Sequence, residues 1–300
     1  MNKFITVKEA AIKWNKSERS VRNYCENERI AGAIFNHGCW LIPIDAKKPS
    51  RLNEKVNKNY LLERLREEKK YQISGGIYHR LQIDLTYNSN HIEGSKLTHD
   101  QTRYIFETRT IASEDKDSSV KVDDVIETIN HFSAIDRVID FANYELSEPF
   151  IKELHKVLKT GTSDANLSWF KVGEYKKRAN EVGNMETTPP QFVAQEMKKL
   201  LDDYNHKDHH SLEDIVEFHV NFERIHPFQD GNGRVGRLII LKECLKNNIV
   251  PFVILDEKKM FYYRGLKKWN QERGWLIDTC LDGQDRVKAY LDYFSISYRD

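Results

Sequence analysis

Cysteine is scarce in this chain of 300 residues, and none of the four lies in a C-x-x-C pair. That scarcity argues against a zinc site or a disulfide framework and fits free thiols in a reducing compartment, so we expect a cytoplasmic protein. No apolar run approaches the roughly 20 residues that span a bilayer, and the first residues lack the apolar segment of a signal peptide. We therefore expect no membrane partner. The cysteines are Cys25, Cys39, Cys244 and Cys280.

Net charge is nearly absent as well, because 47 Lys and Arg residues balance 46 Asp and Glu residues to leave a formal charge of +1. The chain as a whole is therefore not drawn to nucleic acid or to a membrane. It has no repeat of fixed period and no P-loop motif. With 39% hydrophobic and 31% charged residues, we expect a packed core under a charged surface, in one large domain with room for a small module.

The first residues predict that small module. Thr6 can cap a helix with the sequence VKEAAIKW, and Ser17 can cap a second with the sequence ERSVRNYCEN. The stretches IAGAIF and CWLIPI flank a hairpin signal at residues 36–38. Two short helices and a hairpin predict a winged helix-turn-helix-like module over residues 1–48. A polar stretch over residues 49–58 is typical of a linker.

The order of elements in this module resembles excisionase-like and MerR-like DNA-binding modules. Lys16, Arg19 and Arg22 lie on or near its second predicted helix, where residues that read a DNA groove usually lie. Two interpretations stay open: residues 1–45 bind DNA, or the module docks only against its own chain.

Helical periods dominate the predicted second domain, residues 59–300. The one strand-like signal is ANEVGNMETTPP, where glycine and paired prolines indicate a hairpin. We therefore predict a mainly α protein with one small β-hairpin in this domain. The helical stretches are expected near residues 60–70, 77–93, 125–142, 192–204, 215–225 and 238–245.

The most informative stretch is HPFQDGNGRVGR, residues 226–237. Pro227 blocks simple continuation of the helix that ends at His226, the next residues are typical of a loop, and we expect a new helix to begin at Arg234. Glycines in such a loop let backbone N–H groups converge, and the helix N-terminus adds partial positive charge. The stretch therefore predicts an anion-binding site.

The side chains around this loop suit phosphate chemistry. Arg234 and Arg237 are three residues apart and share a helix face, which suits a polyphosphate better than one carboxylate. Asp230 is placed to hold Mg²⁺ against phosphate oxygens. His226 can take a proton near neutral pH. These parts fit phosphoryl or nucleotidyl transfer onto a hydroxyl. A calcium loop does not fit, because Leu241 occupies the position that requires glutamate.

The whole string resembles the signature of Fic-domain proteins, HPFx[D/E]GNGRxxR, and the resemblance extends over roughly residues 60–300. Fic enzymes mostly transfer AMP from ATP to a target Ser, Thr or Tyr hydroxyl and release pyrophosphate. The resemblance implies that His226 is the general base and Asp230 the ligand of Mg²⁺, or of Mn²⁺ in its place. It also implies that ATP phosphates are held by Gly231, Asn232, Gly233, Arg234 and Arg237.

Two further stretches are similar to Fic segments. In YYRGLKKWN, the resemblance implies that Tyr263 and Asn270 contact adenine, although Tyr263 could equally be a core residue. In GEYKKRANEVG, it implies a flap hairpin that includes Val182 and Gly183 and holds the target by strand-like pairing. This segment departs from the family pattern at Lys176, where an arginine is usual.

SNHIEG, from Ser89 to Gly94, resembles the family's inhibitory motif [S/T]xxxE[G/N]. Ser89 and Glu93 are four apart and would share one face of a helix near residues 77–94, and Gly94 is a natural helix end. The resemblance implies that Glu93 pairs with Arg237 in place of the γ-phosphate and so inhibits the enzyme. The alternative is an ordinary surface glutamate at a helix end.

Three functions remain in competition on the sequence alone. The first is an AMP transferase, acting on a target protein or on itself. The second is an enzyme that removes AMP, or works in both directions, with Glu93 activating water. The third is a DNA-binding regulator in which the Fic-like domain senses nucleotide. The sequence leaves open which protein is the target and whether the chain forms a homo-oligomer.

Overall fold

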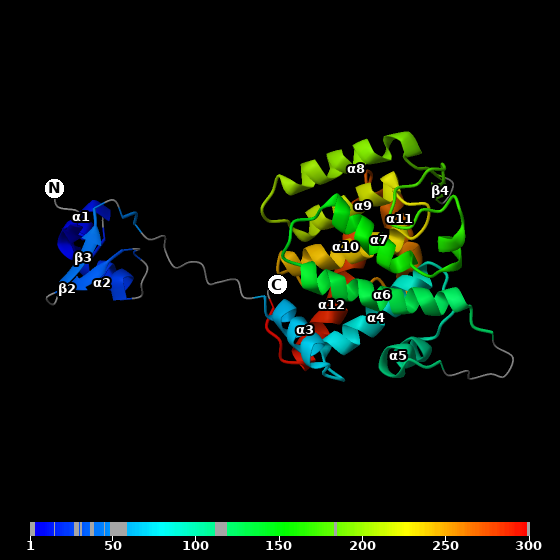
Figure 1. The fold of residues 1–300 in the computed structure, drawn as a ribbon, viewed down its shortest axis with the longest axis horizontal. Helices are drawn as coiled ribbons and strands as arrows, with labels where there is room; N and C mark the ends of the chain where they lie inside the picture. The colour runs from blue at the N-terminus through cyan, green and yellow to red at the C-terminus, as the bar shows by residue number, and fades with distance from the viewer. Residues whose placement is uncertain are drawn as a thin grey trace. The chain divides into compact units, whose positions relative to one another are not determined.

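The protein is described here from a computed structural model. The structure describes residues 4–14, 16–26, 30, 32–36, 39–44, 46–48, 59–111, 119–182 and 185–298. Contacts divide the chain into two units, Met1–Lys58 and Asn59–Asp300 (Figure 1). The predicted linker, residues 49–58, lies outside the described residues.

The smaller unit contains two helices and a three-stranded antiparallel sheet of order β1-β3-β2. Both predicted helix caps form: the Glu9 backbone N–H donates to Thr6 Oγ1 at 3.3 Å, and that of Ser20 to Ser17 Oγ at 3.2 Å. The strand β1 was not expected, since its three residues are too few to show a period. The elements are β1 (Phe4–Thr6), α1 (Val7–Trp14), α2 (Glu18–Glu26), β2 (Ile34–Asn36) and β3 (Cys39–Pro43).

The strands β2 and β3 are those predicted on either side of the hairpin signal, with Ile34 opposite Leu41. Of the turn itself, residues 37 and 38 lie outside the described residues. The buried side of the unit is apolar and is formed by Ala10, Trp14, Val21 and Ile42, among others. That the unit is a winged helix-turn-helix stays a prediction.

The larger unit is mainly helical with one small hairpin, as predicted (Figure 1). Its α-helices are α3 (Tyr60–Tyr71), α4 (Ile77–Ile92), α5 (His99–Thr108), α6 (Val122–Phe141), α7 (Glu148–Lys159), α8 (Pro190–Asn205), α9 (Leu212–Ile225), α10 (Asn232–Lys246), α11 (Lys259–Lys268) and α12 (Gly274–Tyr293). Two short 3₁₀ helices (Ser163–Asn166 and Asp256–Lys258) and the strands β4 (Glu181–Val182) and β5 (Met185–Glu186) complete it.

The helix α10 lies at the centre of the larger unit and packs against α4, α6, α7 and α9 (Figure 1). It is buried on nearly every side, and its buried residues include charged as well as apolar side chains. Its position fixes the site, because the N-terminus of α10 carries the most informative stretch of the sequence. Its buried residues include Val235, Leu238, Ile239, Ile240, Leu241, Cys244 and Leu245.

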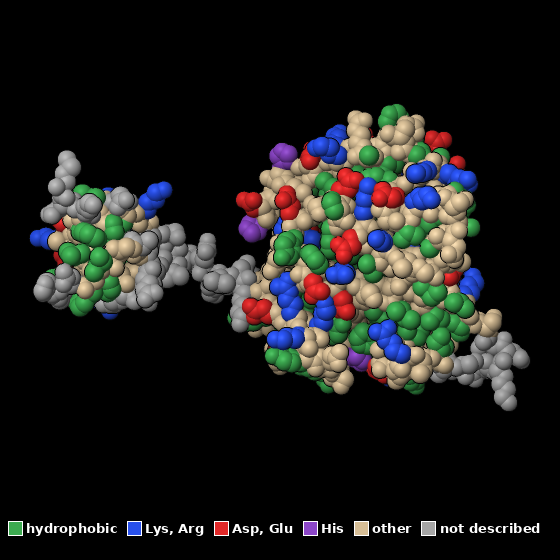
Figure 2. Space-filling view, viewed as in Figure 1, with side chains coloured by type: hydrophobic (Ala, Val, Ile, Leu, Met, Phe, Trp, Pro, Cys, Tyr) green, Lys and Arg blue, Asp and Glu red, His purple; other side chains and the backbone are tan. Residues whose placement is uncertain are grey.

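The surface carries both signs of charge. Figure 2 shows acidic and basic side chains interspersed over the visible face of the larger unit, in keeping with a net charge of +1. Within the described ranges, no helix has both the length and the apolar character that a membrane span needs.

Candidate active site

His226 lies where α9 ends, at the C-cap position with φ of +51°. Its backbone N–H donates to the Phe222 carbonyl at 2.9 Å, and its Nδ1 lies 3.3 Å from the Glu223 carbonyl oxygen. Donation from Nδ1–H leaves Nε2 as a proton acceptor. Burial, aided by the charge of Lys176, lowers the pKa of His226 to about 4. The imidazole is therefore neutral at pH 7 and able to accept a proton.

The loop before α10 is closed by one side chain. Asn232 is buried, and its Oδ1 accepts from the Phe228 N–H at 2.8 Å while its Nδ2 donates to the Phe228 carbonyl at 2.9 Å. Gly231 caps the helix with φ of +79°. The expectation that the helix begins at Arg234 is wrong, because this clamp starts α10 at Asn232. The first backbone N–H groups of α10 have no partner within the helix and are free for an anion.

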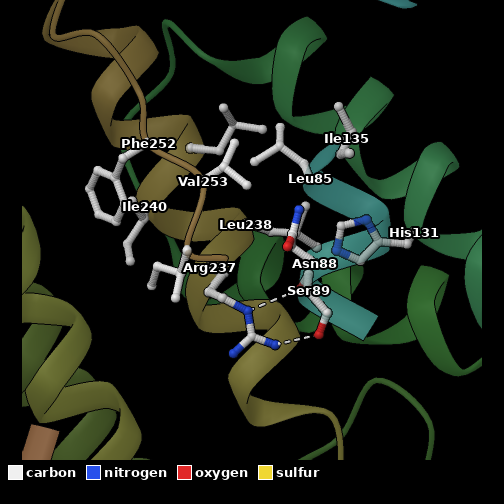
Figure 3. Close-up of a pocket in the computed structure, with 12 residues that line it drawn as sticks. Leu85, Asn88, Ser89, His131, Ile135, Arg237, Leu238, Ile240, Phe252 and Val253 are labelled. Atoms are coloured by element: carbon white, nitrogen blue, oxygen red, sulfur yellow. Dashed lines mark hydrogen bonds between the residues drawn. The ribbon is translucent and has the colours of Figure 1, made fainter. Parts of the chain in front are cut away.

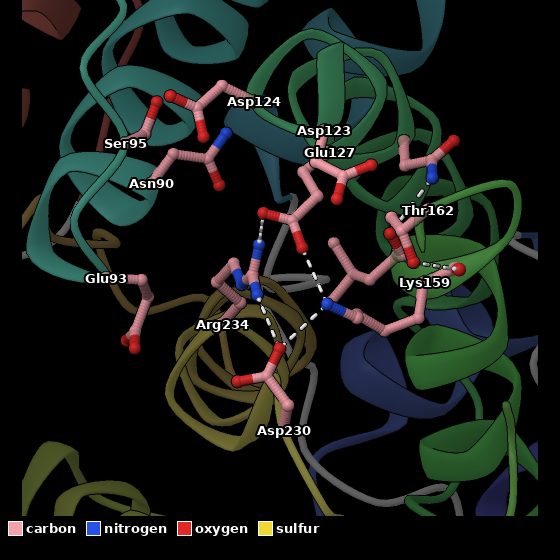
Figure 4. A network of polar contacts seen from close by, with 12 residues as sticks. Asn90, Glu93, Ser95, Asp123, Asp124, Glu127, Lys159, Thr162, Asp230 and Arg234 are labelled. Atoms are coloured by element: carbon pink, nitrogen blue, oxygen red, sulfur yellow. Dashed lines mark hydrogen bonds and ion pairs between the residues drawn. The ribbon is translucent and has the colours of Figure 1, made fainter. Parts of the chain in front are cut away.

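A polar network holds Arg234 (Figure 4). The Arg234 guanidinium pairs with Glu127 of α6 and lies 3.3 Å from Asp230 Oδ2. The Lys159 ammonium lies 2.7 Å from both Asp230 Oδ2 and Glu127 Oε1. Burial alone would raise the pKa of Asp230, but Arg234 and then Lys159 lower it to about 2. The Asp230 carboxylate is therefore ionised at neutral pH.

This carboxylate fits a metal ion that is shared with phosphate. Both cations contact Oδ2 of Asp230, and about half of the side chain is exposed. The described part of the chain contains no group of three or more His, Cys, Asp or Glu side chains that could enclose a metal. Mg²⁺ is commonly held by one or two carboxylates together with substrate phosphates and water. Asp230 as a metal ligand stays a prediction.

Arg237 is held by the C-terminal end of α4. Its Nη2 donates to Glu93 Oε1 at 2.7 Å and to the Ser89 carbonyl at 3.0 Å, and its Nε donates to Ser89 Oγ at 3.0 Å. The helix ends at Ile92, so Glu93 is its C-cap rather than part of the expected helix over 77–94, and Gly94 follows with φ of +97°. The side chains of Arg237 and Glu93 are 10% and 30% exposed. The arginine is enclosed and its carboxylate partner borders solvent.

The Glu93 carboxylate also lies against the loop backbone. A Cβ atom added at Gly233 would overlap Glu93 Oε1 and would lie 2.9 Å from Arg237 Nη1. The glycine therefore leaves room for an anion beside the first turn of α10, and in this structure Glu93 occupies that room.

A small cavity of about 20 Å³ lies beside Arg237. Figure 3 shows Arg237 bonded to Ser89, with His131 from α6 among the other residues that line the cavity. Burial lowers the pKa of His131 to about 3, so this imidazole is neutral. The cavity can hold about one water molecule and is far too small for a nucleotide.

The two residues expected at adenine lie near α11 and differ in their surroundings. Tyr263 is 41% exposed, so the alternative that it is a core residue is wrong; the buried tyrosine is its neighbour Tyr262. The Tyr263 hydroxyl donates to the Ile92 carbonyl at 3.1 Å. Asn270 is exposed, and its Oδ1 accepts from Arg224 at 3.2 Å. Their contact with adenine stays a prediction.

The predicted flap is the hairpin of β4 and β5, in which Val182 pairs with Met185. Val182 is 37% exposed, and Gly183 lies outside the described residues. Lys176 is buried and donates to Asn180 Oδ1 at 2.7 Å and to Thr187 Oγ1 at 2.6 Å, so it joins the two stems of the hairpin. Burial lowers the pKa of Lys176 to about 8. Target binding by the flap stays a prediction.

Residues 145–244 match the Fic/DOC family model. The Drosophila willistoni "Protein adenylyltransferase Fic" is 28% identical over 240 residues, which are 77% of this chain and 43% of that protein. A Fic domain-containing signaling protein from Bacteroides thetaiotaomicron has the same fold, with a TM-score of 0.62 at 22% identity over 81% of this chain and 99% of the other.

Together, the family match and these similarities support a Fic-domain protein. The fold of Fic-1 from C. elegans agrees, with a TM-score of 0.57 at 20% identity over 81% of this chain and 74% of that one. The Drosophila melanogaster "Protein adenylyltransferase Fic" is 27% identical over 194 residues, which are 62% of this chain and 37% of that protein. This chain thus spans less than half the length of these curated relatives.

Proposed function

We propose that this Fic-domain protein is a protein adenylyltransferase, which transfers AMP from ATP to a Ser, Thr or Tyr hydroxyl of a target protein or of itself. The observation that carries the proposal is the meeting of three groups at the N-terminus of α10. They are a neutral imidazole at His226, an ionised carboxylate at Asp230 and a glycine loop whose N–H groups suit phosphate. The names of the curated relatives support the same reaction.

In the proposed reaction, His226 Nε2 takes the proton of the target hydroxyl, whose oxygen then bonds to the α-phosphorus while the bond to pyrophosphate breaks. Arg234 and Arg237 hold the β- and γ-phosphates, and backbone N–H groups of residues 231–233 hold the phosphate oxygens. Mg²⁺ or Mn²⁺, when held by Asp230, would neutralise charge on the phosphates. Tyr263 and Asn270 contact adenine in this proposal, and Val182 in the flap lies along the target chain.

The ion pair of Glu93 with Arg237 supports autoinhibition. Glu93 holds the guanidinium meant for the γ-phosphate, at 2.7 Å, and its carboxylate fills the space beside Gly233. A nucleotide bound in this state would lack one phosphate contact and would be misaligned for in-line attack. Two neighbouring residues help to hold Glu93 in this position. Ser89 accepts a hydrogen bond from Arg237, and Gly94 ends the turn that follows α4.

The partly exposed carboxylate of Glu93 also favours a second candidate function. Once phosphate has taken its arginine, Glu93 would be a carboxylate at the edge of the site, able to activate water and remove AMP from a modified target. In that case Glu93 inhibits the transfer of AMP to the target and promotes its removal.

ATP carrying its label on either the α- or the γ-phosphate tests the proposal. Purified wild-type protein, Glu93→Gly and Glu93→Gly/His226→Ala are incubated with each form in the absence of other proteins, and with a cell extract only in the α-labelled form. Adenylyl transfer predicts protein labelling from the α-phosphate only, strongest in Glu93→Gly and lost in the double variant. Labelling from the γ-phosphate, or no α-phosphate labelling by Glu93→Gly, would reject it.

A further inference from the structure

Another pocket, of about 420 Å³, opens between α4, α5 and α12, and the proposed reaction does not use it. Figure 1 shows these three helices at the end of the larger unit opposite α8. The volume lies in the range of binding sites for small molecules. Among the described residues that line the pocket, basic side chains outnumber the one carboxylate. The charged and titratable residues of the lining are His79, Arg80, Asp84, His99, Arg103 and Arg286.

Asp84 is buried and holds groups of all three helices in place. Its Oδ1 lies 2.9 Å from His99 Nε2, its Oδ2 accepts from the Tyr290 hydroxyl at 2.6 Å, and the Arg286 guanidinium lies 3.6 Å from Oδ2. Burial alone would raise the pKa of Asp84, but these three groups hold it below its usual value. The carboxylate is therefore ionised at neutral pH, and donors already surround it.

The arginines beside Tyr290 bring more positive charge than Asp84 can balance. The Arg80 guanidinium lies 4.0 Å from the centre of the Tyr290 ring, and that of Arg286 lies 5.7 Å from it. Within the described ranges, Arg80 has no carboxylate partner. Packing on the ring orients the Arg80 guanidinium while the N–H groups at its edge stay able to donate. Two guanidinium groups thus flank one ring and share one carboxylate, which leaves a positive charge uncompensated.

Arg103 adds a donor from α5. Its Nε is shielded from solvent and has no hydrogen-bond partner among the described residues, whereas its Nη2 lies 3.1 Å from Asp100. His79 Nε2 likewise lies 3.1 Å from Glu107. Asp100 and Glu107 are 57% and 34% exposed, and ion pairs of this kind are weak. An anion with more than one charge can therefore compete for both basic groups.

The remaining wall of the pocket is aromatic. The side chain of Tyr293 is 77% exposed, and its ring lies edge-on to that of Phe294 with 5.0 Å between the centroids. A flat ring of a ligand can stack there while its anionic end faces the arginines. The planar forks of several arginines match the oxygens of phosphate groups.

We propose that this pocket binds the phosphate groups of a small molecule, with Arg80, Arg103 and Arg286 as the donors. Two sources share this chemistry: a polyphosphate without a base, and a nucleotide whose base stacks on Tyr293. The site is separate from the phosphate-binding loop of α10, and the inference does not rest on the proposed function.

NMR of the full chain with labelled histidine tests the site, with pyrophosphate as the probe at about 0.15 M salt, where distant surface charges are screened. The His99 signal is assigned by its loss in His99→Gln, and pyrophosphate should shift it in a saturable way. Arg80→Gln and Arg286→Gln should each weaken this binding by about tenfold or more, the effect of losing a charge-assisted hydrogen bond. Arg137→Gln is the matched control, since it removes the same charge from an exposed pair with Glu153 and should change nothing.

Two further arms locate the site and identify the source of the phosphate. Arg237→Ala should weaken the binding of pyrophosphate near His226 and leave the shift of His99 unchanged. ADP then replaces pyrophosphate: tighter binding that Tyr293→Ala removes indicates a nucleotide, and equal binding indicates a phosphate without a base.

Three results would overturn the inference. They are a His99 signal that stays unmoved at millimolar pyrophosphate and ADP, a shift that disappears in Arg237→Ala, and equal binding by Arg80→Gln, Arg286→Gln and Arg137→Gln. Calorimetric unfolding of each variant checks that the fold is retained. Because Arg80 and Arg286 lie on different helices, one folded variant is enough to decide.

Discussion

Arg234 and Arg237 lie three residues apart on one helix, and both pair with carboxylates, yet their surroundings differ. Arg234 is 4% exposed and lies between Glu127 and Asp230, in a network that Lys159 completes. Arg237 pairs with Glu93, which stands at the end of α4 with 30% of its side chain exposed. One arginine is fixed by packed elements, and the other is held by a residue that solvent can reach.

This difference indicates that Arg234 has a structural role, whereas the pairing of Arg237 can regulate the site. In the Arg234 network two buried cations, Arg234 and Lys159, are neutralised by Glu127 and by the half-exposed Asp230, so losing a member leaves a buried charge uncompensated. When the Arg237 pair opens, solvent can hydrate Glu93, whereas the enclosed Arg237 needs another anion in its place. The following predictions test this contrast, from the largest expected effect to the smallest.

Neither arginine can act as a base, so we expect His226→Ala to cause the largest loss of AMP-transfer activity. In the Glu93→Gly background, removing the general base should lower AMP transfer by about 10²–10⁴-fold while ATP still binds through the two arginines. Transfer rates and ATP affinity by calorimetry measure both effects. Near-normal α-phosphate labelling by the His226 variant would show that another group takes the proton.

Alanine substitution at each arginine should separate the two by stability. Arg234→Ala leaves Glu127 and Asp230 with Lys159 alone and should cost about 3 kcal/mol, which lowers the midpoint of thermal unfolding by about 6–12 °C. Arg237→Ala should cost about 1 kcal/mol or less, because Glu93 turns to solvent. Calorimetry of the full chain measures both variants. Equal losses of stability would remove the contrast between a fixed and a releasable arginine.

Glu93→Gly should raise labelling from ATP and tighten ATP binding, because it frees Arg237. A hydrogen bond to a charged group contributes roughly 1.5–3 kcal/mol, so an increase of about tenfold or more is expected. Arg237→Ala should gain no activity, since it removes the phosphate partner together with the restraint.

The double variant Glu93→Gly/Arg237→Ala should behave as Arg237→Ala alone, because the two residues act on one another. Assaying AMP removal from a labelled target in the same variants distinguishes a pure restraint from a carboxylate that works in both directions. Unchanged labelling and unchanged ATP affinity in Glu93→Gly would leave Glu93 as an ordinary helix-end residue.

Two arginines on α2 also differ in their pairing, which allows a smaller prediction about DNA. Arg22 pairs with Glu18 at 3.2 Å, whereas Arg19 is exposed and makes no ion pair within the described ranges. If the unit reads DNA, Arg19→Glu should weaken duplex binding more than Arg22→Glu, and loss of one phosphate contact should reduce the salt slope by about one. Fluorescence anisotropy with a duplex pool at several salt concentrations measures this. Salt-independent or absent binding would favour the docking interpretation.

Sequence reasoning located the loop, because its helix end, proline, glycines and arginines are adjacent in the chain. It also placed Glu93 opposite Arg237, although only through a family resemblance. It missed Glu127 and Lys159, which reach the site from other helices through contacts made by packing. With 46 acidic residues in the chain, no local period tells which carboxylate reaches a given arginine.

The helix boundaries had the same limit. The Asn232 side chain makes two hydrogen bonds with the backbone of Phe228, and α10 begins at Asn232. The helix therefore begins two residues earlier than the composition of the loop indicated. At the other end of the site, the turn after Ile92 places Glu93 outside the regular helix. Both deviations are set by specific side-chain and turn geometry, which a hydrophobic period does not record.

The bare backbone at Gly233 has an evolutionary consequence. The same space admits the Glu93 carboxylate in this structure and a phosphate oxygen in the proposed reaction. A descendant that filled this space with a side chain would expel inhibitor and nucleotide together. Mutations at Glu93 or in the turn that carries it can therefore relieve autoinhibition and keep the activity. Mutations that fill the space at Gly233 cannot, because they would remove the activity as well.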